Sequence, residues 1–408
     1  MIKQKELLPN KRFKEFDEVW KERKLEDVIE GLYNGQTPSR FNDRYWNGDI
    51  NWLSSGELNK SVVTHTIEKI TEEGRKAANL KIVPKNTFVM AITGLEAAGT
   101  RGNCAVTGID TTLNQSCMAI YPNRNLLDSH FLFQWYRKVG ETYGLKYTQG
   151  TKQQSYNAAL VNKLKIILPS KIEQQKIGQF FKHLDEMIAV QQRKIDKTKA
   201  LKSAYLAEMF PAEEEHVPKR RFEGFMGDWK EIKLGEVAEF NPNSTIPDVF
   251  KYVDLESVIG TEIVSYRTEF KRSAPSRAQR LAVRGDIFYQ TVRPYQKNNY
   301  LYDLPYNNFV FSTGYAQMRP DINGYFLLSQ IQEEKFVMKV LNRCTGTGYP
   351  AINSNDLANI EIRVPNDRKE QQKIGQFFKH LDEMIATHQQ KLEKLKATKQ
   401  AYLHEMFV

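Results

Sequence analysis

The feature that most constrains this chain is a long segment that occurs twice without a single change. Residues Glu173–Ala189 recur as Glu370–Ala386, an offset of 197, and the similarity continues to residues 210 and 407. A second match, at an offset of 209, lies upstream of each copy. It pairs Arg12, Phe13, Phe16, Trp20, Lys21, Glu22, Lys24, Leu25 and Val28 with Arg221, Phe222, Phe225, Trp229, Lys230, Glu231, Lys233, Leu234 and Val237. Self-similarity at a fixed offset indicates repeated structural units, so we expect two related units.

Between these constant frames lie two middles that differ in length and almost wholly in sequence, at about residues 30–145 and 239–340. A chain of 408 residues is too long for one ordinary core and favours two to four packed units. Constant frames around variable middles suit a protein whose frames bind the same partner twice and whose middles read two different things.

Each repeated segment is predicted to be a long helix. Ser170-x-x-Glu173 and Asp367-x-x-Glu370 fit a capping box, in which the glutamate reaches back to the helix start. Apolar residues then alternate by four and three, which is typical of a coiled-coil seam. We assign helix pairing and partner-subunit contacts to Ile177, Phe181, Leu184, Ile188, Ile374, Phe378, Leu381 and Ile385. Such a helix would be roughly 57 Å long, about one and a half turns of B-DNA.

Identical segments in a pseudo-twofold molecule pack self-complementarily, so the two helices should run antiparallel. The upstream match also places the C-terminal helix end near the N-terminal frame, which gives circular pseudosymmetry. The expected fold class is α+β, with two mixed α/β domains joined by an antiparallel coiled coil. The divisions are a first domain at 1–169, a helix at 170–210, a polar linker at 211–217, a second domain at 218–366 and a helix at 367–408. The alternative is an ordinary helical hairpin inside a core.

The first middle interleaves aromatic residues with small polar donors from Gly35–Arg40 through Tyr45–Ser55. Strands are expected in Lys81–Gly94 and around Ser116–Tyr121, and an amphipathic helix over Asp128–Lys146. The basic loop Gly99–Asn103 fits DNA contact and a solvated loop equally well.

The second middle repeats this order, with strands near Lys251–Leu255 and Asp286–Tyr289 and a helix from about Gly324 to Leu341. Residues 267–297 hold eight Lys or Arg against two acidic residues. Glutamine, tyrosine and threonine intervene in Tyr289–Lys297. Arginine and glutamine can read guanine and adenine edges, and lysine can neutralise phosphates, so DNA contact is favoured over a solvated face.

Both middles end in a Thr/Gly turn, at Thr148–Thr151 and Thr345–Asn353. Such a turn can bind phosphate through backbone N–H groups or simply cap a helix, and both interpretations stay open. The candidate DNA-binding residues are Thr37, Ser39, Arg40, Tyr45, Trp46, Ser54, Ser55, Thr93, Arg101, Asn103, Arg277, Arg280, Gln290, Arg293, Tyr295, Gln296, Lys297, Thr313, Thr347 and Tyr349.

The sequence lacks the motifs of several enzyme classes. It contains no P-loop and no strand-linked dinucleotide fingerprint, and its seven histidines form no ligand-spaced pair. Cys104, Cys117 and Cys344 lack disulfide or zinc spacing and are expected to be buried thiols. Asp321 with Glu333-Glu334-Lys335 resembles a metal-dependent nuclease pattern, but that chemistry needs a strand where the spacing predicts a helix. No catalysis and no metal are therefore expected.

The net charge of +10 favours a polyanionic partner, and the chain has neither a signal peptide nor an apolar run long enough to cross a membrane. We therefore expect a cytoplasmic protein that binds double-stranded DNA and no membrane.

Over essentially its whole length the chain resembles the specificity subunits of type I restriction-modification systems. The resemblance rests on Gly35–Ser39 with Tyr45–Ser55, Thr87–Gly94, Leu113-Asn114-Gln115, Phe311–Gly314, Gly346–Asn353 and the two repeated helices. It implies two recognition domains that read a bipartite DNA sequence, with a spacer set by helix length. It also implies two methyltransferase subunits that use S-adenosylmethionine, and restriction subunits that use ATP and Mg; this chain would bind none of these cofactors.

Two alternatives stay open. One is the specificity subunit of a stand-alone methyltransferase or of a related restriction class. The other, from a different class, is a coiled-coil adaptor whose variable domains bind proteins.

Overall fold

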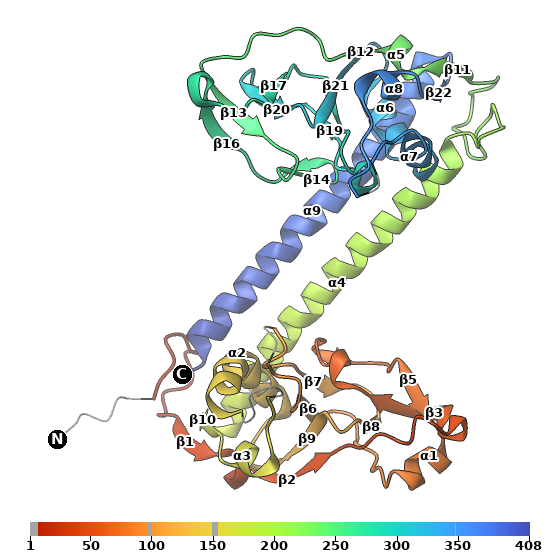
Figure 1. Ribbon diagram of the computed structural model, residues 1–408. Coiled ribbons are helices and arrows are strands. Elements are labelled where there is room, and N and C mark those ends of the chain that lie inside the picture. Colours follow the sequence, from red (N-terminus) through yellow and green to blue (C-terminus); the bar gives the residue numbers. More distant parts are fainter. Residues whose placement is uncertain (1–6, 97–98, 149–153, 347) are drawn as a thin grey trace. The chain divides into compact units, whose positions relative to one another are not determined.

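The chain forms two compact units in a computed structural model that describes residues 7–96, 99–148, 154–346 and 348–408. Unit 1 comprises Met1–Gln191 with Lys391–Val408, and unit 2 comprises Gln192–Gln390 (Figure 1). Helices α4 (Lys171–Met209) and α9 (Arg368–Met406) are each 39 residues long. Each of them gives one end to each unit, so packing groups the helix ends with the two domains.

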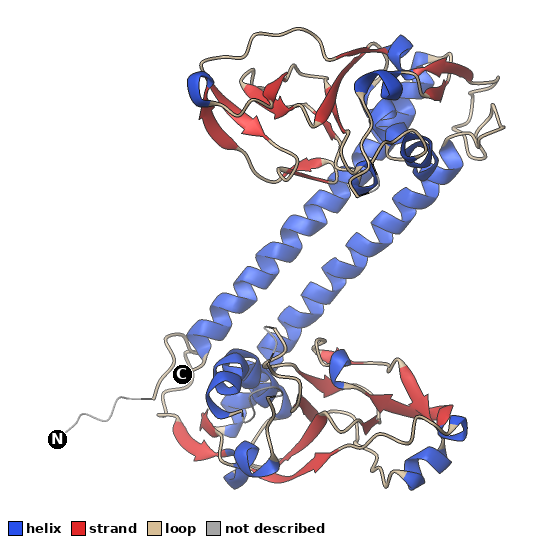
Figure 2. Cartoon of the chain, viewed as in Figure 1, coloured by secondary structure: helices blue, strands red, loops and turns tan. Residues whose placement is uncertain are grey.

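Unit 1 is built on a five-stranded sheet, a three-stranded sheet and a two-stranded sheet, with helices beside them (Figure 2). The strand orders are β2-β9-β6-β7-β4, β5-β3-β8 and β1-β10. The strands are β1 (Lys21–Lys24), β2 (Ile29–Asn34), β3 (Trp46–Leu53), β4 (Val62–Val63), β5 (Glu68–Ile70), β6 (Phe88–Ala91), β7 (Cys104–Thr107), β8 (Thr112–Leu113), β9 (Cys117–Pro122) and β10 (Lys165–Leu168). The helices before α4 are α1 (Glu72–Ala77), α2 (Ser129–Tyr147) and α3 (Ala158–Asn162).

Unit 2 follows the same order with two four-stranded sheets, β12-β21-β18-β19 and β16-β13-β20-β17, and two short pairs, β11-β22 and β14-β15. The strands are β11 (Lys230–Lys233), β12 (Ala238–Phe240), β13 (Val249–Val253), β14 (Val258–Ile259), β15 (Glu262–Ile263), β16 (Arg267–Phe270), β17 (Ala278–Leu281), β18 (Ile287–Gln290), β19 (Tyr300–Leu301), β20 (Phe309–Ser312), β21 (Tyr315–Pro320) and β22 (Glu361–Val364). The helices before α9 are α5 (Leu234–Val237), α6 (Gly324–Ile331), α7 (Glu334–Leu341) and α8 (Ser354–Ala358).

The mixed α/β fold and most predicted elements of the middles are confirmed, with three corrections. The helix expected over Gly324–Leu341 is interrupted between α6 and α7. Within Lys81–Gly94 only β6 is a regular strand. Cys344 is half-buried, whereas Cys104 and Cys117 are buried as expected.

An ion pair buried at the helix starts ties each long helix to its upstream frame. The Arg12 guanidinium donates to both Glu173 carboxylate oxygens at 2.7 Å, and Arg221 donates to both oxygens of Glu370 at 2.7 and 2.8 Å. The glutamate side chains are 0% and 1% exposed. The expected capping boxes are therefore wrong in their second half, because each glutamate binds an arginine instead of the helix start.

A glycine within the repeated segment allows the domain helix to meet the long helix end-on. A Cβ on Gly178 would lie 3.0 Å from the Oδ1 of Asp128, which caps α2, and 3.1 Å from the Phe131 nitrogen. The equivalent Gly375 is closer still, at 2.3 Å from the Oδ1 of Asn323, the cap of α6. The repeated sequence is thus partly explained by how each long helix packs on its own domain.

Within each unit the ends of α4 and α9 pack antiparallel, as predicted. In unit 1 Phe181 packs on Phe407 and Asp185 pairs with Lys399 at 2.6 Å. The offset of 197 maps this ion pair onto Lys202 with Asp382, also at 2.6 Å, in unit 2. All eight predicted pairing residues are buried or half-buried, and each has an exposure similar to that of its repeat copy. They are buried at Ile177, Phe181, Leu184, Ile374, Phe378 and Leu381, and half-buried at Ile188 and Ile385.

The first of these residues do not form a seam separate from the domains. Ile177, Phe181 and Leu184 share a core cluster with Leu403 and Met406 of α9 and with the sheets of unit 1. The residues that pair the two helices in unit 1 are therefore part of the same hydrophobic core as the sheets of that unit.

The predicted closeness of the C-terminal helix end to the N-terminal frame is confirmed. In unit 1 the Lys11 nitrogen donates to the Glu405 oxygen at 2.9 Å, and Lys11 lies over the Tyr402 ring. Unit 2 makes the equivalent contact, from the Arg220 nitrogen to the Glu208 oxygen at 2.9 Å.

The connector after α4 is ordered by one arginine of β22. The Arg363 guanidinium donates to the carbonyl oxygens of Ala212, Glu213 and Glu215 and to the Glu231 carboxylate. The polar segment 211–217 is therefore folded onto unit 2.

Glu173→Gln should destabilise the protein by about 3 to 5 kcal/mol, because it leaves the partly buried Arg12 guanidinium without its counter-charge. Urea unfolding measures the change. Glu22→Gln is the matched control, because Glu22 pairs with Lys165 in an exposed bridge and its loss should change stability little. Equal effects of the two substitutions would contradict the structural role of Glu173.

Asp185→Asn should destabilise the protein most at neutral pH. Burial lowers the pKa of Lys399, and Asp185 opposes that shift, so without Asp185 the folded protein releases the Lys399 proton at a lower pH. The unfolded chain then binds the extra proton, and stability rises with pH relative to wild type. Urea titrations from neutral to alkaline pH should show the deficit shrinking. Asp196→Asn, at an exposed position without a lysine partner among the described residues, should show a deficit that is small and constant with pH.

Candidate nucleic-acid interface

In unit 2, backbone hydrogen bonds bring together four predicted residues that are far apart in sequence. The Thr313 nitrogen donates to the Arg277 oxygen at 2.8 Å, and the Arg293 nitrogen donates to the Pro350 oxygen, next to Tyr349, at 2.8 Å. Thr291, which follows β18, connects these two contacts by donating to Gly314 and accepting from Ile352, both at 3.0 Å. We call this surface, defined by Arg277, Arg293, Thr313 and Tyr349, the unit 2 face.

Unit 1 has the same backbone junction with different side chains. The Ile92 nitrogen, just after β6, donates to Ser116 at 2.9 Å and the Ile92 oxygen accepts from Tyr156 at 2.8 Å. The predicted Thr93 forms an isolated bridge with Ser155 beside it. Two domains with unrelated middles therefore assemble one site geometry.

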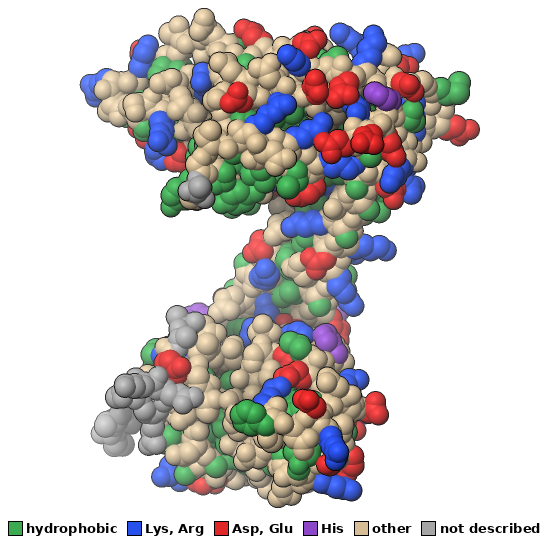
Figure 3. Space-filling model, turned by 45° about the vertical axis from the view of Figure 1, so that its right-hand side comes forward, with side chains coloured by type: hydrophobic (Ala, Val, Ile, Leu, Met, Phe, Trp, Pro, Cys, Tyr) green, Lys and Arg blue, Asp and Glu red, His purple; other side chains and the backbone are tan. Residues whose placement is uncertain are grey.

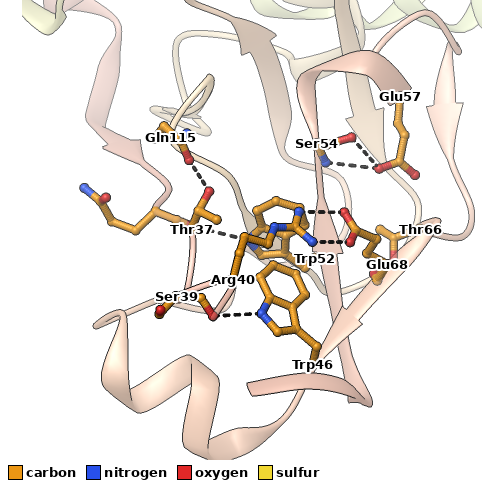
Figure 4. A network of polar contacts seen from close by, with 11 residues as sticks. Thr37, Ser39, Arg40, Trp46, Trp52, Ser54, Glu57, Thr66, Glu68 and Gln115 are labelled. Carbon is orange, nitrogen blue, oxygen red and sulfur yellow. Dashed lines mark hydrogen bonds and ion pairs between the residues drawn. The ribbon is translucent and has the colours of Figure 1, made fainter. Parts of the chain in front are cut away.

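The aromatic stretch of the first middle forms a cluster around Arg40 (Figure 4). The Arg40 guanidinium lies 3.7 Å from the Trp46 ring centre and 5.0 Å from that of Trp52. It also forms a two-point ion pair with Glu68, which raises the pKa of Arg40 and lowers the pKa of Glu68. The Trp46 indole N–H donates to the Ser39 oxygen at 3.0 Å. Arg40, Ser39 and Trp46 thus hold one another in place.

Other predicted residues of unit 1 also have internal partners. The Thr37 hydroxyl donates to the side chain of Gln115, which precedes Ser116 of the backbone junction. Ser54 donates its backbone N–H and its hydroxyl to Glu57, a carboxylate that is 4% exposed. Ser54 and Ser55 begin a short 3-10 turn, and the Tyr45 backbone supports α1.

Arg101 has a largely buried side chain that stabilises the fold of unit 1. Its side chain, 10% exposed, pairs with Glu141 of α2 and donates to the Glu96 oxygen and to Gln154. The Asn103 oxygen accepts a backbone bond from Ala91. Arg101 therefore matches neither interpretation of Gly99–Asn103, because its side chain packs against α2 instead of facing solvent or DNA.

Gln290 and Lys297 were predicted to contact DNA, but their side chains support the turn that carries Arg293. Gln290 is 2% exposed and donates to the Val292 oxygen and to Gln296 at 2.7 Å. Lys297 pairs with Glu334 of α7. Tyr295 is 50% exposed beside them. The predicted Thr347 and the turn residues 149–151 lie outside the described residues.

The second Thr/Gly turn is not a helix cap. Helix α7 ends at Leu341 with Asn342 as its cap, and Thr345 forms a separate bridge with Ala351. Its Gly346 has a φ of 91°, a conformation that glycine tolerates without strain.

The basic stretch of unit 2 retains unpaired charge. Arg267, Arg284 and Lys297 have carboxylate partners. Among the described residues no such partner exists for Lys271, Arg272, Arg277, Arg280 and Arg293, and burial lowers the pKa of Arg280. Figure 3 shows basic and acidic side chains interspersed on the visible surface, so the location of the unpaired cations is more informative than net charge.

Sequence reasoning missed a polar cleft beside the unit 2 face. It has a volume of about 420 Å³, and its polar lining includes Asn241, Asn243, Ser244, Thr245, Lys271 and Gln279, next to Arg280. The segment Asn241–Ile246 follows β12 as Gly35–Arg40 follows β2. That equivalence was the available signal for these residues.

The described residues contain no group of three or more His, Cys, Asp or Glu side chains placed to hold a metal ion. Glu333 is the N-cap residue of α7, so it does not lie on the strand that nuclease chemistry would require. Burial raises the pKa of its carboxyl. No described helix is long and apolar enough to cross a membrane.

The family of the chain follows from its two matching regions. Residues 17–200 and 226–397 both match the family model of the type I restriction modification DNA specificity domain. The chain belongs to this family. Each match covers one domain with most of its long helix, so the internal duplication is a duplication of the specificity domain.

Several specificity subunits of type I restriction enzymes are similar to this chain. The HindI subunit of Haemophilus influenzae is 25% identical over 193 residues, 45% of this chain and 41% of that protein. The MjaIX subunit of Methanocaldococcus jannaschii is 26% identical over 41% of this chain and 38% of its own length. The chain thus spans about two fifths of these relatives, whereas the MjaVIII subunit of the same organism aligns over 95% and 92% at 21% identity.

The solved structure of a type I restriction-modification S subunit from M. genitalium has the same fold. It superposes with a TM-score of 0.70 over 98% of this chain and 99% of that one, at 16% identity. The architecture of two specificity domains with long helices is therefore shared despite the low identity.

Arg277→Gln should weaken binding to double-stranded DNA and reduce the slope of log K against log salt by about one, as expected for one lost phosphate contact. Arg284→Gln, which removes an exposed arginine already paired with Asp303, should leave the slope unchanged. Affinities measured at several salt concentrations test this. Equal slopes for Arg277→Gln and wild type would remove Arg277 from the interface.

Proposed function

We propose that this chain is the sequence-recognition subunit of a type I restriction-modification complex and reads a bipartite, asymmetric site in double-stranded DNA. Each unit would read one half-site. The observation that carries this proposal is that two matching frames hold one backbone junction, while the side chains at the two junctions differ. The spacer between half-sites would follow from the helices, each roughly 58 Å long at 1.5 Å per residue.

The partners we propose are two methyltransferase subunits, one on each copy of the repeated helix, together with restriction subunits. Support comes from repeated residues that are exposed on the long helices. Gln179, His183 and Glu186 are exposed, as are their copies Gln376, His380 and Glu383. Met187 and Met384, on the same stripe, are 39% and 37% exposed. Two identical exposed stripes suit two copies of one partner.

In this proposal the catalytic chemistry belongs to the partners. S-adenosylmethionine for adenine methylation would bind the methyltransferase subunits, and ATP and Mg would bind the restriction subunits. This chain would position the DNA for both reactions.

The test exchanges residues 30–150 for the corresponding part of another specificity subunit and maps methylated adenines across the host genome by single-molecule sequencing. One half of the methylated motif should change and the other half should stay. Exchange of 239–340 is the matched experiment and should change the other half only. A motif unaffected by either exchange, or sequence-independent DNA binding by the assembled complex, would refute the proposal.

A further inference from the structure

Two residues of unit 2 adopt a backbone conformation that their side chains do not favour. Arg293 and Lys297 flank the 3-10 turn Pro294–Gln296 with φ values of 55° and 56°. The other four non-glycine residues with positive φ in the described chain are Asn47, Asn79, Asn86 and Asn241, and asparagine tolerates this region well. Strained backbone persists where surrounding contacts over-determine it, and it clusters at functional sites.

Buried amides hold the turn on both sides. Gln290 bonds to the Val292 oxygen and to Gln296, and its own backbone N–H donates to the Oδ1 of Asn299, which is 1% exposed. The Gln332 amide donates to the Lys297 oxygen at 3.1 Å, and the Arg293 N–H donates to the Pro350 oxygen. These hydrogen bonds therefore fix the conformation of the turn that carries Arg293.

This turn carries an arginine whose guanidinium stacks on an aromatic ring. The Arg293 guanidinium lies 4.3 Å from the centre of the Tyr349 ring, which is 65% exposed. In the part of the chain that the structure describes, no carboxylate pairs with Arg293. This differs from Arg40, Arg101 and Lys297, which are all neutralised by acidic partners.

We infer that Arg293, stacked on Tyr349, is the specificity-determining residue that reads a guanine in the half-site of unit 2. A guanidinium held in one plane can donate two parallel hydrogen bonds to the O6 and N7 acceptors of guanine in the major groove. Arg277, also at the unit 2 face, would by contrast contact phosphate, and such a contact positions the DNA without reading its sequence. The inference rests on the proposed function and deepens it.

The test uses the full chain in complex with its methyltransferase subunits and maps methylated motifs for Arg293→Ala and Arg293→Lys. Both variants should lose discrimination at one guanine of the half-site read by unit 2, by about tenfold to a hundredfold, while the other half-site stays intact. Lysine keeps the charge but not the planar pair of donors. A phosphate contact would therefore be rescued by Arg293→Lys, and that rescue would overturn the inference.

Tyr349→Phe and Tyr349→Ala provide a second readout. Phenylalanine keeps a ring for the guanidinium to stack on and should retain the motif, whereas alanine should relax it at the same base. Arg284→Ala is the control for loss of a surface arginine and should retain the motif. Thermal unfolding of each variant separates a folding defect from a change in recognition.

The outcomes distinguish this inference from the proposed function. If both Arg293 variants methylate the wild-type motif with undiminished discrimination while exchange of 239–340 changes one half of it, the inference fails and the proposed function stands. If that exchange also leaves the motif unchanged, the proposed function itself fails.

Discussion

The structure of each unit depends on a buried ion pair at the start of its long helix, Glu173 with Arg12 and Glu370 with Arg221. A carboxylate removed from water is costly unless its oxygens are fully bonded, and here both oxygens accept from one guanidinium. The pair joins residues more than a hundred positions apart. It attaches the upstream frame, the β1 or β11 region and the helix to one another, so the variable middle between them is closed at both ends.

This closure explains how the middles can vary while the site stays in place. The backbone bonds at Ile92 in unit 1 and Thr291 in unit 2 depend on peptide groups and not on side-chain identity. Side chains around that junction can therefore change without loss of its geometry. In unit 1 the junction is accompanied by a cluster of Arg40 with two tryptophans, and in unit 2 by a strained turn and a stacked arginine.

The two sites differ in whether their predicted basic residues are ion-paired, and the net charge of the chain does not reveal this difference. The basic residues predicted in unit 1 are ion-paired, whereas Arg277, Arg280 and Arg293 of unit 2 have no carboxylate partner among the described residues. Arginine held by a partner can position neighbouring groups, and unpaired arginine can contact phosphates or bases. The two domains of one family therefore differ in how their predicted basic residues are paired.

The sequence by itself determined the duplication, the two long helices, their antiparallel packing and the closeness of the chain end to the first frame. The duplication and its symmetry follow from exact repetition, which can be read directly from the sequence. The helices follow from apolar periodicity, which is a local pattern. Only the tertiary structure decided which glutamates pair with Arg12 and Arg221, and which predicted cations lack a carboxylate partner among the described residues. Those outcomes depend on contacts between residues far apart in sequence, such as Arg101 with Glu141 and Lys297 with Glu334, and no local pattern encodes them.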